Sequence, residues 1–191
     1  KRHNCLRAVL AARSAAAGLS PEVEKPGLLP PRPDEQGGCE AAGSVRAGGQ
    51  RPADVYVPAW GIHGPAAFDL AVSSGMRSRV LAASAADGGH AATAYEERKR
   101  QHLNTAAQCQ AQGIQFQPLV AEACGGGWGP GAVKVWKQLA ALVAARSGAS
   151  PGEAKDQLMQ SLSVALQREN ARAVLRRLAA AEEVGPGLAD P

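Results

Sequence analysis

The chain has 191 residues, of which 45% are hydrophobic and 20% charged, a composition that suits one domain with a hydrophobic core and some loose sequence. The formal charge of +4 allows nucleic acid as a partner, but the 4% aromatic content argues against a base-stacking platform for single strands. The sequence has no long apolar run and no signal peptide, so we expect an intracellular protein. Its four cysteines are widely spaced, which indicates free thiols rather than a zinc site or a disulfide framework.

The first part of the chain contains a helix, a weak strand and a loop. Apolar residues recur at helical spacing over residues 4–17, and Gly18 supplies a stop. Residues 22–29 can form a short edge strand, interrupted by Pro26. Residues 30–51 are rich in Pro, Gly and small side chains without periodicity, so we expect a flexible loop there.

A β-hairpin is predicted next. Residues 53–57 and 66–72 both alternate with period two, and the intervening residues 58–65 contain two prolines and two glycines typical of a turn. Centring the turn places Val55 opposite Phe68 and Val57 opposite Ala66. One face of the hairpin then belongs to the core, and its members are Val55, Val57, Phe68, Leu70 and Val72.

The second half of the chain predicts three helices and a strand. Residues 91–112 are typical of one long polar helix, and residues 114–121 of a strand. The glycines of residues 125–129 turn the chain into a helix whose apolar positions are Val133, Trp136, Leu139, Leu142 and Val143. Ser150 and Pro151 cap a last helix with Leu158, Leu162, Leu166, Val174 and Leu178 on or near one stripe.

This order of elements predicts a mixed α/β domain. Its core comprises residues 1–29 and 52–178, separated by the loop, and we expect residues 179–191 to form a disordered tail.

The register of the hairpin brings two carboxylates together. Asp54 falls opposite Asp69 on the face away from the core, where opposed side chains have Cβ atoms about 4.5 to 5.5 Å apart. Like charges at that distance repel, whereas a divalent cation between them would reverse the sign of the interaction. The alternative is that both aspartates simply point to solvent from an exposed face of the sheet.

A lysine in the following helix bears on this choice. The inward stripe of residues 91–112 is Ala92, Tyr95, Lys99, Leu103 and Ala106, and the lysine interrupts it. Lys99 can extend outward to solvent, or it can reach the carboxylates as a positive charge for a phosphate. Glu96, one turn earlier, is a third acid or a salt-bridge partner within the helix, and the latter is favoured.

These segments resemble a known family of nucleases. The quoted segments are Arg51-Pro52-Ala53-Asp54-Val55, Ala67-Phe68-Asp69-Leu70-Ala71-Val72 and Tyr95-Glu96-Glu97-Arg98-Lys99, with further similarity at Arg2-His3-Asn4, residues 113–122, Gly-Gly-Trp-Gly and residues 168–172. Together they resemble the restriction-endonuclease-like, or PD-(D/E)xK, nuclease at the C-terminal end of the reverse transcriptases of certain non-LTR retrotransposons. The resemblance implies a core of helix, three strands, helix and strand, with two C-terminal helices.

The resemblance also implies a site and a chemistry. Asp54 and Asp69 match the metal-binding acids, and Lys99 matches a catalytic lysine displaced from the strand to the next helix. The expected activity is nicking of DNA with Mg²⁺ or Mn²⁺, with a reverse transcriptase domain in the same polypeptide and a nuclear location for an active protein.

The sequence departs from the family pattern in three places. Ala53 separates the usual proline from Asp54, Ala71 replaces the lysine expected after the second acid, and residues 1–18 contain no acid. Glu24 is the nearest substitute for the missing first-helix glutamate and is the third metal-ligand candidate.

Two other functions remain open. The chain can be a catalytically inactive remnant of the same fold, because it lacks the first-helix acid. It can also be a non-enzymatic interaction domain that uses Arg168, Arg172 and Arg176 on the last helix to bind nucleic acid or a protein, although such a stripe is more often a solvated helix face.

Overall fold

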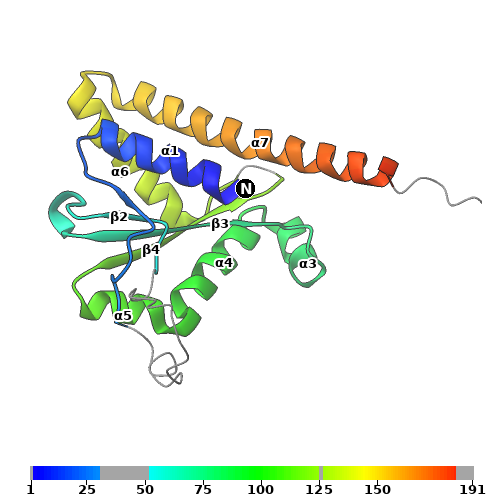
Figure 1. Ribbon diagram of the computed structural model, residues 1–191, viewed down its shortest axis with the longest axis horizontal. Coiled ribbons are helices and arrows are strands. Elements are labelled where there is room, and N and C mark those ends of the chain that lie inside the picture. Colours follow the sequence, from blue (N-terminus) through cyan, green and yellow to red (C-terminus); the bar gives the residue numbers. More distant parts are fainter. Residues whose placement is uncertain (1, 31–51, 125–126, 184–191) are drawn as a thin grey trace, which may run out of the picture.

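The computed structural model describes residues 2–30, 52–124 and 127–183, and within them it shows a mixed α/β fold in three layers (Figure 1). A four-stranded sheet lies between a layer formed by α1, α6 and α7 and a layer formed by α4 and α5. The elements in chain order are α1 (Arg2–Ala16), β1 (Glu22–Val23), β2 (Val55–Val57), the 3-10 turn η1 (Gly61–His63), β3 (Ala66–Ser73), α3 (Ser78–Ala86), α4 (His90–Gln101), the 3-10 turn η2 (His102–Asn104), α5 (Thr105–Ala111), β4 (Gln115–Glu122), α6 (Pro130–Ser147) and α7 (Pro151–Glu183).

The sheet has the strand order β1-β2-β3-β4. β1, β2 and β3 are antiparallel, and their register pairs Val55 with Phe68 and Val57 with Ala66, which confirms the predicted hairpin. β4 pairs in parallel with β3, because α3, α4 and α5 carry the chain back to the start of the sheet. The predicted edge strand over residues 22–29 is reduced to the two residues of β1.

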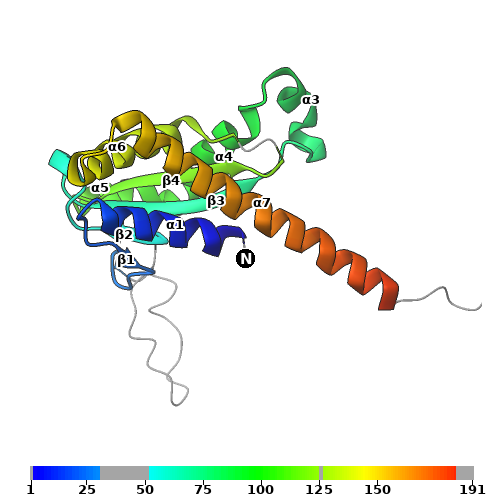
Figure 2. The same cartoon turned by 90° about the horizontal axis from the view of Figure 1, so that it is seen from above.

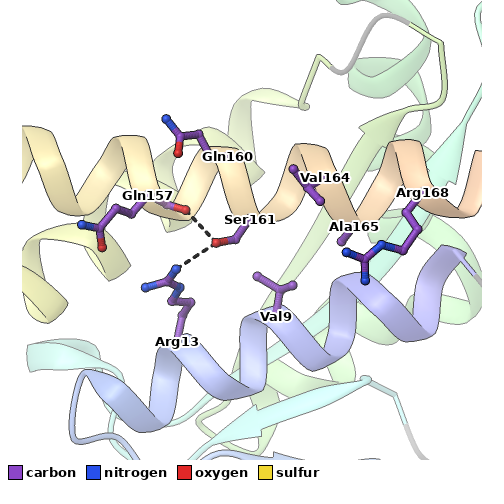
Figure 3. A pocket seen from close by; sticks show the side chains of 8 residues that line it. All are labelled: Val9, Arg13, Gln157, Gln160, Ser161, Val164, Ala165 and Arg168. Carbon is purple, nitrogen blue, oxygen red and sulfur yellow. Dashed lines mark hydrogen bonds between the residues drawn. The ribbon is translucent and has the colours of Figure 1, made fainter.

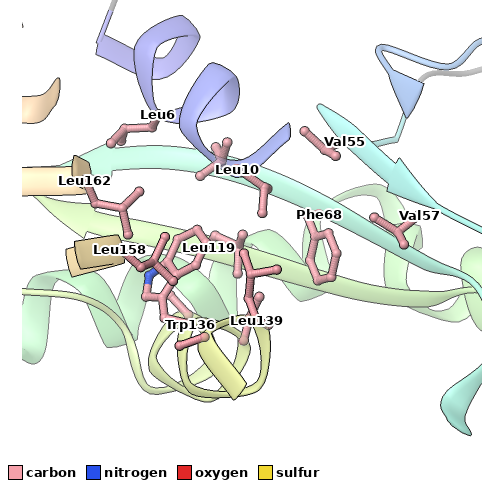
Figure 4. Packing of buried hydrophobic residues seen from close by; sticks show 14 of the residues in the cluster. Leu6, Leu10, Val55, Val57, Phe68, Leu119, Trp136, Leu139, Leu158 and Leu162 are labelled. Atoms are coloured by element: carbon pink, nitrogen blue, oxygen red, sulfur yellow. The ribbon is translucent and has the colours of Figure 1, made fainter. Parts of the chain in front are cut away.

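The main core lies between the sheet and the layer of α1, α6 and α7 (Figure 4). The inward face of the hairpin is the predicted one, with Val72 partly buried and its other four residues fully enclosed. Leu6 and Leu10 of α1 and Trp136 and Leu139 of α6 pack on this face. Each fully buried side chain of this size stabilises the fold by about 1.5 to 3 kcal/mol relative to an exposed one.

The opposite face of the sheet carries α4 and α5, where one long helix was predicted over residues 91–112. That prediction is wrong, because Leu103 and Asn104 adopt left-handed backbone conformations with φ of 51° and 56°. Residues other than glycine seldom adopt this conformation, and it ends α4 at Gln101. Leu103 is 49% exposed and does not belong to the inward stripe assigned to it.

α3 was not predicted. It covers nine residues that are mostly Ala and Ser, and none of them is buried, so it lacks the apolar stripe by which a helix is found in a sequence. It packs beside α4 beyond the end of β3 (Figure 1).

α7 is longer than expected and projects past the sheet (Figure 2). Leu158, Leu162 and Leu166 are buried, as predicted, but Val174 and Leu178 are more than half exposed because the helix has left the body of the protein there. α7 continues through residues 179–183, which were predicted to begin a disordered tail. The rest of that tail, residues 184–191, lies outside the described residues, as do residues 31–51 of the loop predicted over residues 30–51 and the glycines 125 and 126.

Candidate active site

The candidate site lies beside β3, at the point where the chain enters β2. Regular pairing starts at Val55, and Asp54 sits in a bend just before the strand. The Asp54 N–H donates to the carbonyl of Phe68 at 2.9 Å, while the N–H of Leu70 donates to Asp54 Oδ2 at 2.7 Å. The predicted register placed Asp54 opposite Asp69 as a strand partner. In the structure the regular pairing does not include Asp54. Its carboxylate instead takes the place of a backbone acceptor beside β3.

His3 holds the same carboxylate from the start of α1. Its Nε2 lies 2.7 Å from Asp54 Oδ2, and this hydrogen bond raises the pKa of His3 above its ordinary value, against the opposing effect of burial. Sequence reasoning assigned no role to His3. The signal available was its place in the first turn of a helix whose Leu6 and Leu10 face the sheet, which puts the histidine near the strand ends.

Lys99 approaches the second carboxylate from α4. Its Nζ donates to Asp69 Oδ2 at 2.6 Å, so of the two directions considered for this side chain it takes the one toward the carboxylates. Asp69 lies within β3, on the face that packs against α4. The side chains of Lys99 and Asp69 are 26% and 16% exposed, so solvent reaches the pair.

Opposing effects act on the pKa of the Asp69 carboxyl group. Burial raises the pKa of its carboxyl group, the Lys99 ammonium lowers it, and the nearby Asp54 charge raises it again, with a net rise. Asp54 is therefore near enough for its charge to act on the Asp69 carboxyl group. Additional positive charge at this point would stabilise both ionised groups.

Glu24, the third predicted metal ligand, has a different environment. Its carboxylate is paired with Arg7 of α1, while its backbone N–H donates to the carbonyl of Asp54 at 2.9 Å. Glu24 directly follows β1, and its backbone lies next to that of Asp54. Its side chain is paired with Arg7.

Glu96 has the favoured role of a salt-bridge partner within the helix, to Arg100 at 3.4 Å, and a second role that was not predicted. It is fully buried, and its two carboxylate oxygens accept the N–H groups of Gly131 and Ala132, each at 3.0 Å. These N–H groups lie in the first turn of α6, where they have no acceptor within the helix and where a negative charge also complements the helix dipole. A Cβ at Gly129 would collide with this carboxylate, so the glycine allows the approach. Glu96 ties α4, and therefore Lys99, to α6.

The predicted basic stripe on α7 is only partly free to bind a ligand, because one of its three arginines is paired with an acid. Arg172 pairs with Glu169 at 2.5 Å, and Arg168 borders a groove between α1 and α7 (Figure 3). Arg13 on the other side of that groove donates to Ser161 at 2.8 Å. This groove lies on the α1, α6 and α7 layer, whereas Lys99 belongs to the opposite layer.

The donor set suits a hard divalent cation held by few protein ligands. Oδ2 of Asp54 and Oδ2 of Asp69 are both engaged, while no described residue donates a hydrogen bond to either Oδ1. Mg²⁺ takes carboxylate oxygens and keeps several waters, so two carboxylates suffice for it. Within the described residues no group of three or more His, Cys, Asp and Glu side chains is placed to hold a metal.

Comparison of the chain with protein-family models, curated proteins and solved structures gives no match. None of the helices in residues 2–30, 52–124 and 127–183 combines the length and apolar character that crossing a membrane requires.

Proposed function

We propose that the chain is a metal-dependent DNA endonuclease of the restriction-endonuclease-like class, which nicks one strand of a duplex. The observation that carries this proposal is the convergence of Asp54, Asp69 and Lys99 from three separate segments on one edge of β3. The order of helix, three strands, helices, strand and two helices supports it, because it agrees with the core that the resemblance implies.

Each side chain has a role in this proposal. Asp54 and Asp69 hold the ion, His3 and the Leu70 N–H orient Asp54, and Lys99 presents its charge to the phosphate. Mg²⁺ or Mn²⁺ at this position would activate water and stabilise the leaving oxygen of a phosphodiester. A fixed ammonium in a partly enclosed site stabilises the negative charge that develops on the phosphate oxygens.

The biological setting that we propose comes from the resemblance and not from the site itself. A nick leaves a 3′ hydroxyl that can prime reverse transcription, which would place a reverse transcriptase domain in the same polypeptide and the active protein in the nucleus. Glu24 is not given a metal-binding role here, because Arg7 engages its carboxylate.

Plasmid nicking tests the proposal. The purified protein is expected to convert supercoiled DNA to the open circular form with Mg²⁺ or Mn²⁺ and not with EDTA. Asp69→Ala is expected to abolish the cut while the circular dichroism spectrum is kept. Asp156→Asn, an exposed acid on α7, is the matched control. Cutting that survives Asp69→Ala contradicts the proposal, and binding without cutting in either metal favours the inactive remnant.

A further inference from the structure

A cationic channel adjoins the Asp69–Lys99 pair on the α3 and α4 side of the molecule. Two neighbouring hollows form it, with volumes of about 300 Å³ and 250 Å³. The first is lined by α4 and the His102 that follows it and includes Lys99, and the second lies between α3, α4 and the end of β3. Tyr95 and Arg98 line both hollows, so the two form one continuous surface that starts at the candidate site.

Basic side chains line this channel. Its lining contains Arg77, Arg79, Arg98, Lys99 and His102 and no Asp or Glu. Arg77, Arg79 and Arg98 are exposed, and none of them forms an ion pair with a carboxylate in the described part of the chain. Because, among the described residues, Arg77, Arg79 and Arg98 keep their charge unpaired along the two hollows, they create a field that attracts a polyanion.

Arg98 lies at the junction of the two hollows. Its guanidinium is 4.2 Å from the centre of the Tyr95 ring, a cation–π contact that restrains the side chain. A guanidinium presents its N–H donors in a planar fork that matches phosphate oxygens.

We infer that this channel, rather than the arginines of α7, binds the phosphate backbone of duplex DNA and leads it to Asp69 and Lys99. The inference rests on the proposed function in naming DNA as the polyanion. It assigns Arg77, Arg79 and Arg98 as substrate-binding residues, a role that sequence reasoning gave to Arg168, Arg172 and Arg176. The α7 arginines lie on the other layer, where Glu169 already neutralises Arg172.

A binding assay without a cleavage-competent metal tests the inference separately from the activity. Anisotropy of a short labelled duplex in EDTA, over a range of NaCl concentrations, gives the Kd and its salt dependence. Arg79→Gln/Arg98→Gln removes one charge from each helix of the channel. Lys134→Gln/Lys137→Gln on α6 removes the same charge from exposed positions outside it, and Arg168→Gln/Arg176→Gln tests the α7 stripe.

The channel double variant is expected to weaken binding roughly tenfold and to make the slope of log K against log salt shallower by about 1.8, which is about 0.9 for each phosphate that an arginine no longer neutralises. The α6 and α7 variants are expected to bind like wild type at equal thermal stability. Unchanged binding by the channel variant, or an equal weakening in the α7 variant, overturns the inference. So does wild-type protein that binds vesicles of anionic lipid but not DNA.

The two proposals fail differently. If the channel variant loses binding and wild type never cuts with Mg²⁺ or Mn²⁺, the nuclease activity is refuted and the DNA path stands. If wild type cuts in a manner that depends on Asp69 while the channel variant binds and cuts normally, the path is refuted and the activity stands.

Discussion

Nζ of Lys99 lies 2.6 Å from Oδ2 of Asp69, which joins the helix α4 to the middle of β3. The two residues are 30 positions apart, and neither side chain is fully enclosed. The pair is thus both a link in the structure and an accessible charge, and the same contact serves positioning and chemistry in the proposed nuclease.

The ammonium of Lys99 is expected to act on the rate of cleavage rather than on metal binding. Lys99→Ala should lower the nicking rate by about 10²- to 10³-fold, the usual effect of removing one group that stabilises transition-state charge. Lys99→Arg should retain part of the rate. Single-turnover nicking kinetics measures this effect, with Lys134→Ala as the exposed control. An unchanged rate in Lys99→Ala removes the lysine from the mechanism.

The buried Glu96 is expected to matter for stability. Glu96→Ala leaves the N–H groups of Gly131 and Ala132 without their acceptor, and hydrogen bonds to a charged group contribute about 1.5 to 3 kcal/mol. We expect a loss of about 2 to 4 kcal/mol in the free energy of unfolding, measured by urea denaturation. Glu97→Ala, one residue along and exposed, should change this free energy by less than about 0.5 kcal/mol. Equal effects of the two substitutions would show that the cap is unimportant.

The start of α7 gives a prediction about pH. Glu153 and Ser150 form a reciprocal cap, and hydrogen bonds from Ser150 lower the pKa of the Glu153 carboxyl group below its usual 4.5. The stabilisation is therefore complete above pH 4.5 and is lost as pH falls through the lower value in the folded state. Glu153→Gln should lower the Tm at neutral pH, and the difference from wild type should shrink in acid. A difference that grows in acid would contradict this linkage.

The hairpin and the lysine could be predicted because each leaves a local pattern. Alternation in both strands specified the register of Val55 with Phe68, and Lys99 was conspicuous as a charge within an apolar stripe. The left-handed break at Leu103 and Asn104 could not be predicted, because Leu rarely adopts that conformation and one Asn, which adopts it more readily, does not by itself mark a helix end.

The partners of the carboxylates also escaped sequence reasoning. Glu96 caps a helix that begins 34 residues later, and no local spacing connects it with Pro130. His3 reaches Asp54 only because α1 packs across the sheet. Contacts between distant elements of this kind depend on the packing of the layers, which a single sequence specifies only indirectly.

The most direct test of the account is whether Asp54 and Asp69 hold one ion in common. Mn²⁺ titration followed by electron paramagnetic resonance should show one site in the wild-type protein. Asp54→Asn and Asp69→Asn should each abolish that same site, because an amide keeps the shape but removes the charge, while Asp156→Asn should keep it. Loss of the site in only one of the two variants, or unchanged binding in both, would contradict a shared ion and with it the proposed nuclease.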